Sequence, residues 1–279
     1  MTTLAATPAR PLFRKIAAIL AVAGTAFLAA CDTLGIGTTP PPPQQQIGLY
    51  ELRMYTAAEG KMEALDARFR DHTIELFVRH GMKPIGFFHT VVPAGAPADN
   101  RLIYILGFKD RAARDIAWAT FAADEEWKKV YAASQVNGSL TTKIENIFLT
   151  PTDYSPKLNT TPAATPRLFE LRTYTTNPGK LETLHTRFRD NTLRIFAKHG
   201  MTSVLYWRPV DGQAGMENKM VYLLAFPNVT ARTNAWAAFS ADEEWKKVAA
   251  DSQKDGTILI SPGGVVSVQL SPTDYSPLR

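Results

Sequence analysis

Apolar residues along the chain alternate between the spacing of a strand and the spacing of a helix, and the same order occurs twice. In a first helix, from about Lys61 to His80, the apolar residues share one face that can be buried. The continuous apolar run "RLIYILGF" is typical of a central strand. The strands expected in the first half are 47–55, 83–91, 101–108 and 144–149, with helical sequence in two pieces before the last one. This β-α-β-β-α-β order predicts an α+β fold of the ferredoxin-like type.

The second half of the sequence repeats the first. "YELRMY" at 50–55 returns as "FELRTY" at 169–174, and "FAADEEWKKV" at 121–130 returns as "FSADEEWKKV" at 239–248. Both copies close on "PTDYSP". A repeat of about 105 residues is long enough for one small domain. The domains expected from this duplication are 47–156 and 167–279, joined by a linker at 157–166.

Several segments of the second copy carry a resemblance to a known family. They are "FELRTYTTNPGKLETL", the "KHGM" helix end, the arginine of "TARTNAW" and the "SADEEW" helix start. In this order they resemble NIPSNAP-family domains of the dimeric α/β-barrel superfamily, and the resemblance covers 47–150 and 167–271. It implies two units that pack sheet to sheet. Because both units lie in one chain, it implies an intrachain pseudo-dimeric α/β barrel that can exist as a monomer.

The first thirty residues have the pattern of a signal peptide. Basic residues precede an apolar run from Ile16 to Ala30, which is too short to cross a membrane comfortably as a permanent helix. The run closes on "LAAC", and Cys31 is the single cysteine of the chain. This segment resembles a bacterial lipobox, which implies cleavage before Cys31 and acylation of its thiol and its new amino terminus. The alternative is that Cys31 is a buried or accidental cysteine, or that ordinary signal cleavage occurs nearby.

Residues 31–46 are expected to be the acylated cysteine and a Pro/Gln-rich tether, because "PPPPQQQ" has no apolar periodicity. The acyl chains would bind a lipid bilayer and hold the protein there. We therefore expect a lipid-anchored protein of the bacterial cell envelope that faces the periplasm. Asp32 directly follows the acylated position and resembles an inner-membrane retention signal.

The charge of the chain says little about its partners. There are 31 basic and 26 acidic residues, a formal charge of +5, but three of the basic residues and none of the acidic ones lie in the leader. Cleavage of the leader would leave a charge of +2. Since the sequence also has no clustered basic patch with stacking aromatic residues, we expect no nucleic-acid partner.

The repeated hexamer has one apolar face and one charged face. Tyr50, Leu52 and Met54 alternate with the charged set, and we expect this apolar face to meet the helices. The charged face would then point to solvent or into the space between the two sheets. We expect the second, as a barrel lining in which glutamate and arginine pair, or as a pocket whose arginines bind a small anionic or carbonyl ligand. The candidate residues are Glu51, Arg53, Tyr55, Glu170, Arg172 and Tyr174.

Two histidines form another candidate site. His80 and His199 each precede a glycine at the end of the first helix, where an imidazole can hydrogen-bond free carbonyl groups. Acid–base catalysis is the alternative role. The recurring tryptophans are expected in the core. The sequence has no spacing typical of metal ligands, no phosphate-binding loop and no nucleophile elbow, so we expect neither a metal site nor a cofactor.

Three functions fit these observations. One is a membrane-anchored binding or interaction module of unknown biochemical activity. Another is a cofactor-independent enzyme, monooxygenase-like or isomerase-like, which the superfamily resemblance implies. A haem-binding protein is the third, but neither copy places a histidine on a sheet at matching positions. A closed, salt-bridged barrel would favour the module, whereas an open apolar cavity with a few polar groups would favour the enzyme.

Overall fold

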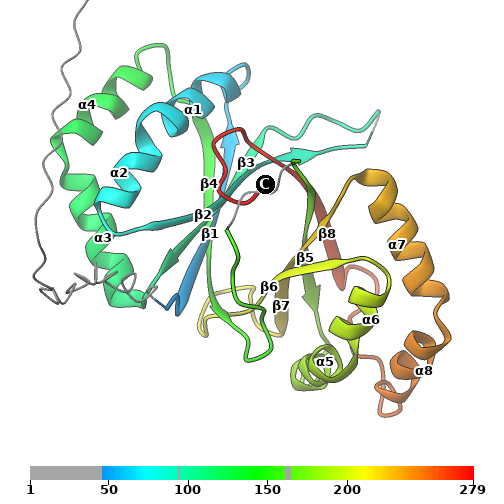
Figure 1. Cartoon of the computed structure of the whole chain (residues 1–279). Coiled ribbons are helices and arrows are strands. Elements are labelled where there is room, and N and C mark those ends of the chain that lie inside the picture. Colours follow the sequence, from blue (N-terminus) through cyan, green and yellow to red (C-terminus); the bar gives the residue numbers. More distant parts are fainter. Residues whose placement is uncertain (1–45, 94, 161–164) are drawn as a thin grey trace, which may run out of the picture. The chain divides into compact units, whose positions relative to one another are not determined.

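Eight antiparallel strands close into one barrel, and the helices pack outside it in two groups (Figure 1). The computed structural model describes residues 46–93, 95–160 and 165–279. The predicted leader, Cys31 and nearly all of the predicted tether therefore lie outside the described residues. Gln45–Arg279 form one compact unit, and everything below concerns that unit.

Both repeats have the expected order of elements, and in each the first helix contains a π-helical turn. The first repeat comprises β1 (Leu49–Ala57), α1 (Met62–Arg68), η1 (Phe69–Thr73), α2 (Ile74–Arg79), β2 (Lys83–Val91), β3 (Arg101–Phe108), α3 (Arg111–Ala123), α4 (Glu125–Ser134) and β4 (Thr141–Pro151). The second comprises β5 (Leu168–Thr175), α5 (Leu181–Arg187), η2 (Phe188–Thr192), α6 (Leu193–Lys198), β6 (Thr202–Pro209), β7 (Lys219–Phe226), α7 (Val229–Ala241), α8 (Glu243–Asp251) and β8 (Val265–Pro272).

The strand order shows how the two repeats form one barrel. Within the repeats the order is β4-β1-β3-β2 and β8-β5-β7-β6, the arrangement of a ferredoxin-like sheet. The sheets join at both edges, where β2 pairs with β8 and β4 pairs with β6. Because the barrel is closed, these edges do not remain open for pairing with other chains. The predicted pseudo-dimer within one chain is confirmed.

Three clusters of buried apolar residues hold the described unit together. One lies inside the barrel and combines residues from both sheets, among them Phe88, Phe169 and Trp207. The other two lie between sheet and helices, around Phe69 in the first repeat and Phe188 in the second. The closed barrel and these clusters are all built from the compact unit itself, so the unit can fold without the residues that precede it.

Helix ends follow from local sequence. Gly81 and Gly200 come directly after the last turn of the first helix in each repeat, with φ of +80° and +74°, a conformation that favours glycine. Asp124 and Asp242 each accept hydrogen bonds from two backbone N–H groups at the start of α4 and α8. Both aspartates therefore open a helix.

The two "PTDYSP" segments are exchanged between the repeats. Tyr154 packs on the helix-side cluster of the second repeat, and Tyr275 packs on that of the first. Arg70 donates two hydrogen bonds to Asp274, at 2.8 and 2.9 Å. Arg189 donates two to Asp153, at 2.7 and 2.8 Å. Each repeat is thus completed by the end of the other.

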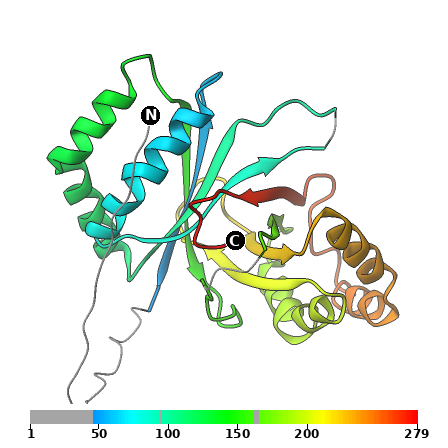
Figure 2. The ribbon, with the colours of Figure 1, turned by 45° about the horizontal axis from the view of Figure 1, so that its top comes forward.

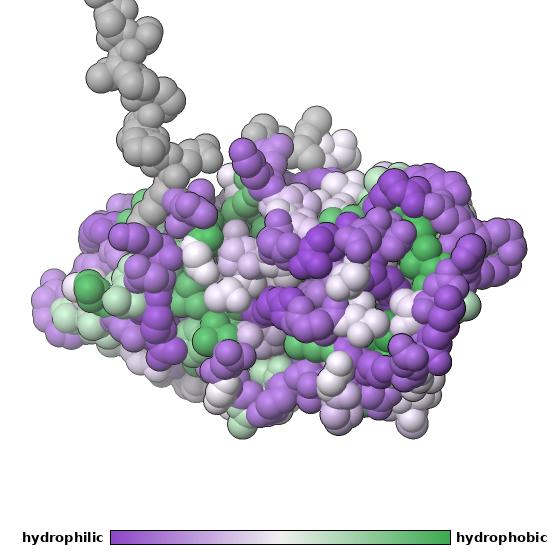
Figure 3. All heavy atoms as spheres, turned by 90° about the horizontal axis from the view of Figure 1, so that it is seen from below, coloured by the Kyte–Doolittle hydropathy of each residue, from purple (hydrophilic) through white to green (hydrophobic). Residues whose placement is uncertain are grey.

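Hydrophobic residues are sparse on the face of the molecule seen in Figure 3. Hydrophilic residues cover most of that face, and the hydrophobic ones form small separate patches. Among the described residues, no helix has both the length and the apolar character that a membrane span requires. Most of the large apolar side chains lie instead in the three buried clusters.

Candidate functional site

The charged face of the repeated hexamer lies beneath the helices, not inside the barrel. Tyr50 and Leu52 of β1 belong to the cluster inside the barrel, whereas Glu51 contacts Trp118 of helix α3. The expectation that the apolar face meets the helices is therefore wrong, and so is the assignment of these charges as a barrel lining. Each face of the strand packs against another part of the protein. The inner face is apolar because it meets the apolar sheet of the other repeat. The outer face is polar because it meets polar side chains of α3.

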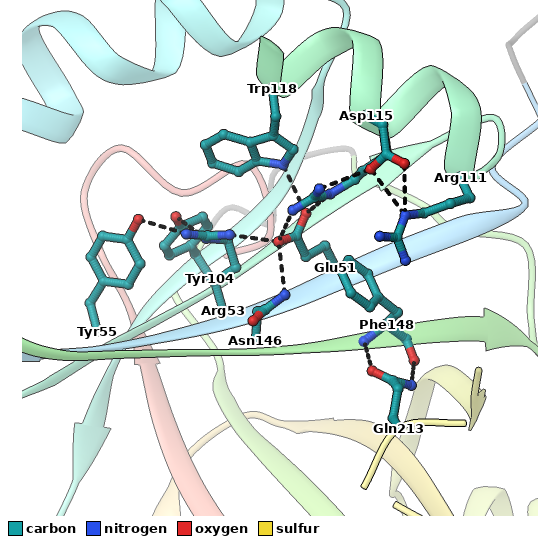
Figure 4. Close-up of polar contacts among 11 residues, drawn as sticks. Glu51, Arg53, Tyr55, Tyr104, Arg111, Asp115, Trp118, Asn146, Phe148 and Gln213 are labelled. Atoms are coloured by element: carbon teal, nitrogen blue, oxygen red, sulfur yellow. Dashed lines mark hydrogen bonds and ion pairs between the residues drawn. The ribbon is translucent and has the colours of Figure 1, made fainter. Parts of the chain in front are cut away.

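Glu51 is the centre of a buried polar cluster, shown in Figure 4. It is 0% exposed and pairs with two arginines, Arg53 at 2.6 Å and Arg114 at 2.8 Å. Trp118 Nε1 donates a further hydrogen bond at 2.8 Å, and Asn146 Nδ2 donates one at 3.4 Å. Burial alone would raise the pKa of Glu51, but the hydrogen bond from Arg114 and the charges of both arginines outweigh it and lower that pKa.

All three guanidinium nitrogens of Arg53 also donate hydrogen bonds to protein groups. Its Nη1 donates to Glu51, its Nε donates to the Tyr104 hydroxyl at 2.7 Å, and its Nη2 donates to the Tyr55 hydroxyl at 3.1 Å. The guanidinium also stacks on Trp118, 4.4 Å from the ring centroid. The predicted Glu–Arg pairing is confirmed, although it occurs between sheet and helix.

The second repeat builds the same cluster. Glu170, also 0% exposed, pairs with Arg172 and Arg232, both at 2.7 Å. Trp236 Nε1 donates to it at 2.8 Å. Arg172 donates to the hydroxyl groups of Tyr222 and Tyr174, as Arg53 does to those of Tyr104 and Tyr55. Burial alone would raise the pKa of Glu170, but the hydrogen bond from Arg232 and the charge of Arg172 outweigh it and lower that pKa.

In both clusters the carboxylate oxygens and the three nitrogens of the strand arginine already have protein partners. A ligand at Arg53 or Arg172 would have to break charge-assisted bonds inside the protein, which are among the stronger hydrogen bonds. The arrangement is therefore suited to fixing helix α3 or α7 on the sheet. It is less suited to exchanging protons or binding a substrate.

Part of each cluster was missed by reasoning from the sequence. Arg114 and Trp118 contribute three of the contacts to Glu51, yet the tryptophans were expected only as core residues. The signal was present: an arginine and a tryptophan four residues apart recur in "ARDIAW" and "ARTNAW". Residues four apart lie on the same helix face, so this face could have been matched to the glutamate of the hexamer.

His80 and His199 contact aspartates rather than free carbonyl groups. His80 Nε2 lies 2.7 Å from Oδ2 of Asp124, and its Nδ1 lies 3.1 Å from the Thr120 hydroxyl. His199 Nε2 lies 2.6 Å from Oδ2 of Asp242. The predicted hydrogen bonds to carbonyl groups are wrong, because each imidazole bonds instead to the aspartate that begins the next helical piece. Each histidine ties the end of the first helix to the start of α4 or α8.

The position of Asp66 in the first repeat is occupied by His185 in the second. Asp66 accepts a hydrogen bond from Tyr275 at 2.6 Å and lies 3.0 Å from His89. His185 is 0% exposed, with Nδ1 2.6 Å from the Tyr154 hydroxyl and Nε2 without a partner among the described residues. Burial lowers the pKa of His185 to about 4, and Arg208 adds to that effect. This imidazole is therefore neutral in the folded protein at neutral pH.

The depressed pKa of His185 predicts a loss of stability in mild acid. The unfolded histidine binds its proton near the ordinary value of 6.5 and the folded one only near 4, so the free energy of unfolding falls as pH falls between these values. The full effect is about 3 kcal/mol. His185→Gln should remove this pH dependence in urea melts at pH 7 and pH 4.5, whereas the same change at exposed His72 should leave it unaltered. Equal slopes for wild type and His185→Gln would contradict the prediction.

The described unit has no cluster of metal-ligating side chains, and the interior of its barrel is filled. Within residues 46–93, 95–160 and 165–279, no group of three or more histidine, cysteine, aspartate or glutamate side chains is placed to hold a metal ion. The interior of the barrel is packed with large side chains such as Trp207, Phe88 and Phe169, each 0% exposed.

Comparison with known proteins identifies the repeats. The NIPSNAP family model matches residues 50–156 and again residues 169–277. A search of curated proteins found no match. Among solved structures, an uncharacterized NIPSNAP-like domain protein from Burkholderia xenovorans is 22% identical, with 40% of this chain and 90% of that chain covered and a TM-score of 0.35.

Two further structures resemble the whole barrel. A protein from Lactobacillus acidophilus NCFM named as a candidate monooxygenase is 14% identical, with 81% of this chain and 94% of that chain covered and a TM-score of 0.52. An anthrone oxidase-like protein is 11% identical, with 84% and 94% covered and a TM-score of 0.53. At such identities these two share the fold alone. The two family matches span most of the sequence, and the chain belongs to the NIPSNAP family.

Proposed function

We propose that this NIPSNAP-family chain is a lipid-anchored binding module of the bacterial cell envelope. The observation that carries the proposal is the filled barrel interior, in which residues from both sheets pack against each other and are at most 9% exposed. A packed interior stabilises the fold but offers no room for a substrate. The buried glutamate clusters support the same conclusion, since their charged groups bind one another.

A cofactor-independent enzyme of the monooxygenase or isomerase type is the alternative. Its support is the fold shared with the candidate monooxygenase and the anthrone oxidase-like protein. Fold similarity does not carry an activity from one protein to another. The discriminating measurement is native mass spectrometry of the purified protein followed by incubation of any retained molecule with oxygen. Retention without turnover supports the binding module, and turnover supports the enzyme.

The anchor rests on the sequence before the described unit. The apolar run ending in "LAAC" supports acylation of Cys31, and the proline-rich stretch after it would hold the folded unit at a short distance from the bilayer. Acylation at two positions gives slow release from a membrane, because each buried methylene contributes roughly 0.8 kcal/mol. Location in the inner membrane, with the unit in the periplasm, is supported by Asp32.

Replacing the cysteine tests the anchor directly. We expect Cys31→Ser to abolish labelling by a fatty-acid analogue, because the acylated thiol is lost. Ser252→Ala, which leaves the single cysteine in place, should label like the wild type. Labelling of Cys31→Ser at the level of the wild type would exclude the lipoprotein proposal.

A further inference from the structure

A groove of about 500 Å³ lies between the first helix and helix α4 of the first repeat. Both views of the ribbon show α1 and α4 next to each other on the outside of the barrel (Figures 1 and 2). The residues that define this α1–α4 groove are Ala67, Arg68, Asp71, His72, Lys129 and Ala133, with further small residues between them. Its size falls in the range of sites for small organic molecules.

Arg68 is a buried cation without an acidic partner. It is 7% exposed, and among the described residues it forms no ion pair. Its Nη1 donates to the Ser134 hydroxyl at 3.2 Å, while its Nε has no hydrogen-bond partner in the described unit. The guanidinium lies 5.6 Å from the ring centroid of Trp127 and 5.7 Å from that of Tyr131. A buried charge is normally paired, so an anion is the missing partner that this guanidinium would accept.

The backbone around Arg68 is also specialised. The π-helical turn η1 begins at the next residue, and the Thr73 hydroxyl donates to the Arg68 carbonyl group at 3.0 Å. Such turns widen a helix locally and are frequent at functional sites. Here the turn forms the wall of the groove, with Asp71 and His72 in the turn itself.

The charge of the groove favours an anion with an apolar body. Arg68 and the exposed Lys129 are both positive, and Lys129 forms no ion pair within the described unit. Asp71, also exposed, is the acidic residue of the groove, so the positive charges exceed the negative ones. The rest of the wall combines small apolar side chains, including Ala67 and Ala133, with His72 and Ser134. Such a surface suits an aliphatic chain better than a strongly hydrated ion.

The second repeat offers a comparison within the same molecule. Arg187 is likewise buried, donates to Ser252 at 3.3 Å and has an unpartnered Nε. There, however, the lysine is already paired, since Lys247 lies 2.6 Å from Asp251, the residue that replaces Ala133. Threonine replaces alanine at the position of Ala67. The free positive charge and the apolar wall are thus combined at the groove of the first repeat.

We propose that the α1–α4 groove binds a soluble aliphatic monocarboxylate. The carboxylate pairs with Arg68 and Lys129, and the hydrocarbon chain lies along the alanines. The inference rests on the proposed binding function and names its ligand class. The carboxylate would provide the acidic partner that Arg68 lacks among the described residues.

Isothermal titration calorimetry of residues 45–279 with octanoate tests the proposal. Octanoate should bind, whereas octan-1-ol should bind roughly tenfold to hundredfold more weakly because it lacks the charged hydrogen bonds. Octylammonium should not bind measurably. Arg68→Met should weaken octanoate by a similar factor, and the matched change Arg187→Met should leave its Kd unaltered.

Ala133→Asp provides a second test that does not alter the buried arginine. Ala133 is exposed, so the fold should tolerate the change, and the new carboxylate should pair with Lys129 as Asp251 pairs with Lys247. Octanoate should then bind about tenfold more weakly or not at all. Any one of three outcomes would overturn the proposal. Octanol could bind as tightly as octanoate, Arg68→Met and Arg187→Met could have equal effects, or the protein could bind anionic vesicles but not octanoate. If octanoate fails while native mass spectrometry still finds a retained molecule, the ligand class is wrong and the binding function stands.

Discussion

Residues 47–156 expressed without the second repeat should self-associate or aggregate. On its own, this half would expose the inner face of its sheet, where Tyr50, Leu52 and Phe88 now pack against residues of the other half. It would also leave β2 and β4 as open edges, because their partners β8 and β6 belong to the second repeat. Apolar faces and unpaired strand edges both promote association between chains.

Sedimentation velocity at several concentrations is the appropriate measurement. Residues 45–279 serve as the control and should sediment as a monomer, since their barrel is closed. Two copies of the half-chain could rebuild an eight-stranded barrel by pairing with each other, so a defined dimer would agree with the prediction. A stable, fully soluble monomer of 47–156 would contradict it and would show that the paired sheets are dispensable.

Glu51→Gln should lower the free energy of unfolding by about 3–5 kcal/mol. The change removes the carboxylate that neutralises Arg53 and Arg114 and leaves two arginines in contact with a neutral amide. Glu51 is fully buried, so water cannot replace the lost interaction. Arg53→Met should cost less, because Glu51 would keep Arg114 and the Trp118 N–H.

Guanidinium melts of matched variants would measure this effect. Glu170→Gln, at the equivalent site of the second repeat, should give a loss of the same size. Glu75→Gln is the control: this glutamate also pairs with an arginine, but its side chain is 77% exposed, and the loss should be at most about 1 kcal/mol. Losses below about 1 kcal/mol at both Glu51 and Glu170 would mean that the clusters add little to stability.

Much of the fold could be predicted because the same pattern of strands and helices occurs in both repeats. The strands β2 and β3 begin and end at the predicted residues, and the first helix of each repeat lies where its apolar spacing placed it. These are local properties: strand periodicity, apolar runs and helix caps depend on neighbours in the chain. The pseudo-dimeric barrel was implied by the family resemblance, and it agrees with the need of each sheet to cover its second face.

The orientation of the charged hexamer could not be predicted in the same way. Alternation shows that Glu51 and Arg53 share a face, but it does not show what that face meets. The deciding residues, Arg114 and Trp118, lie 63 and 67 positions away from Glu51 on helix α3. The same holds for His80, whose partner Asp124 lies 44 positions away. Contacts between elements so distant in sequence depend on how the elements pack.

Because the ends of the repeats are exchanged, the two repeats cannot complete their folding independently during synthesis. Tyr275 and Asp274 complete the helix side of the first repeat, and Leu278 packs inside the barrel, where its N–H bonds the Ile85 carbonyl group. The first repeat is synthesised before the second, yet these contacts come from residues that follow β8, the last strand of the second repeat. Until those residues are synthesised, the first repeat lacks part of its packing, so its folding can be completed only after the second repeat has been made.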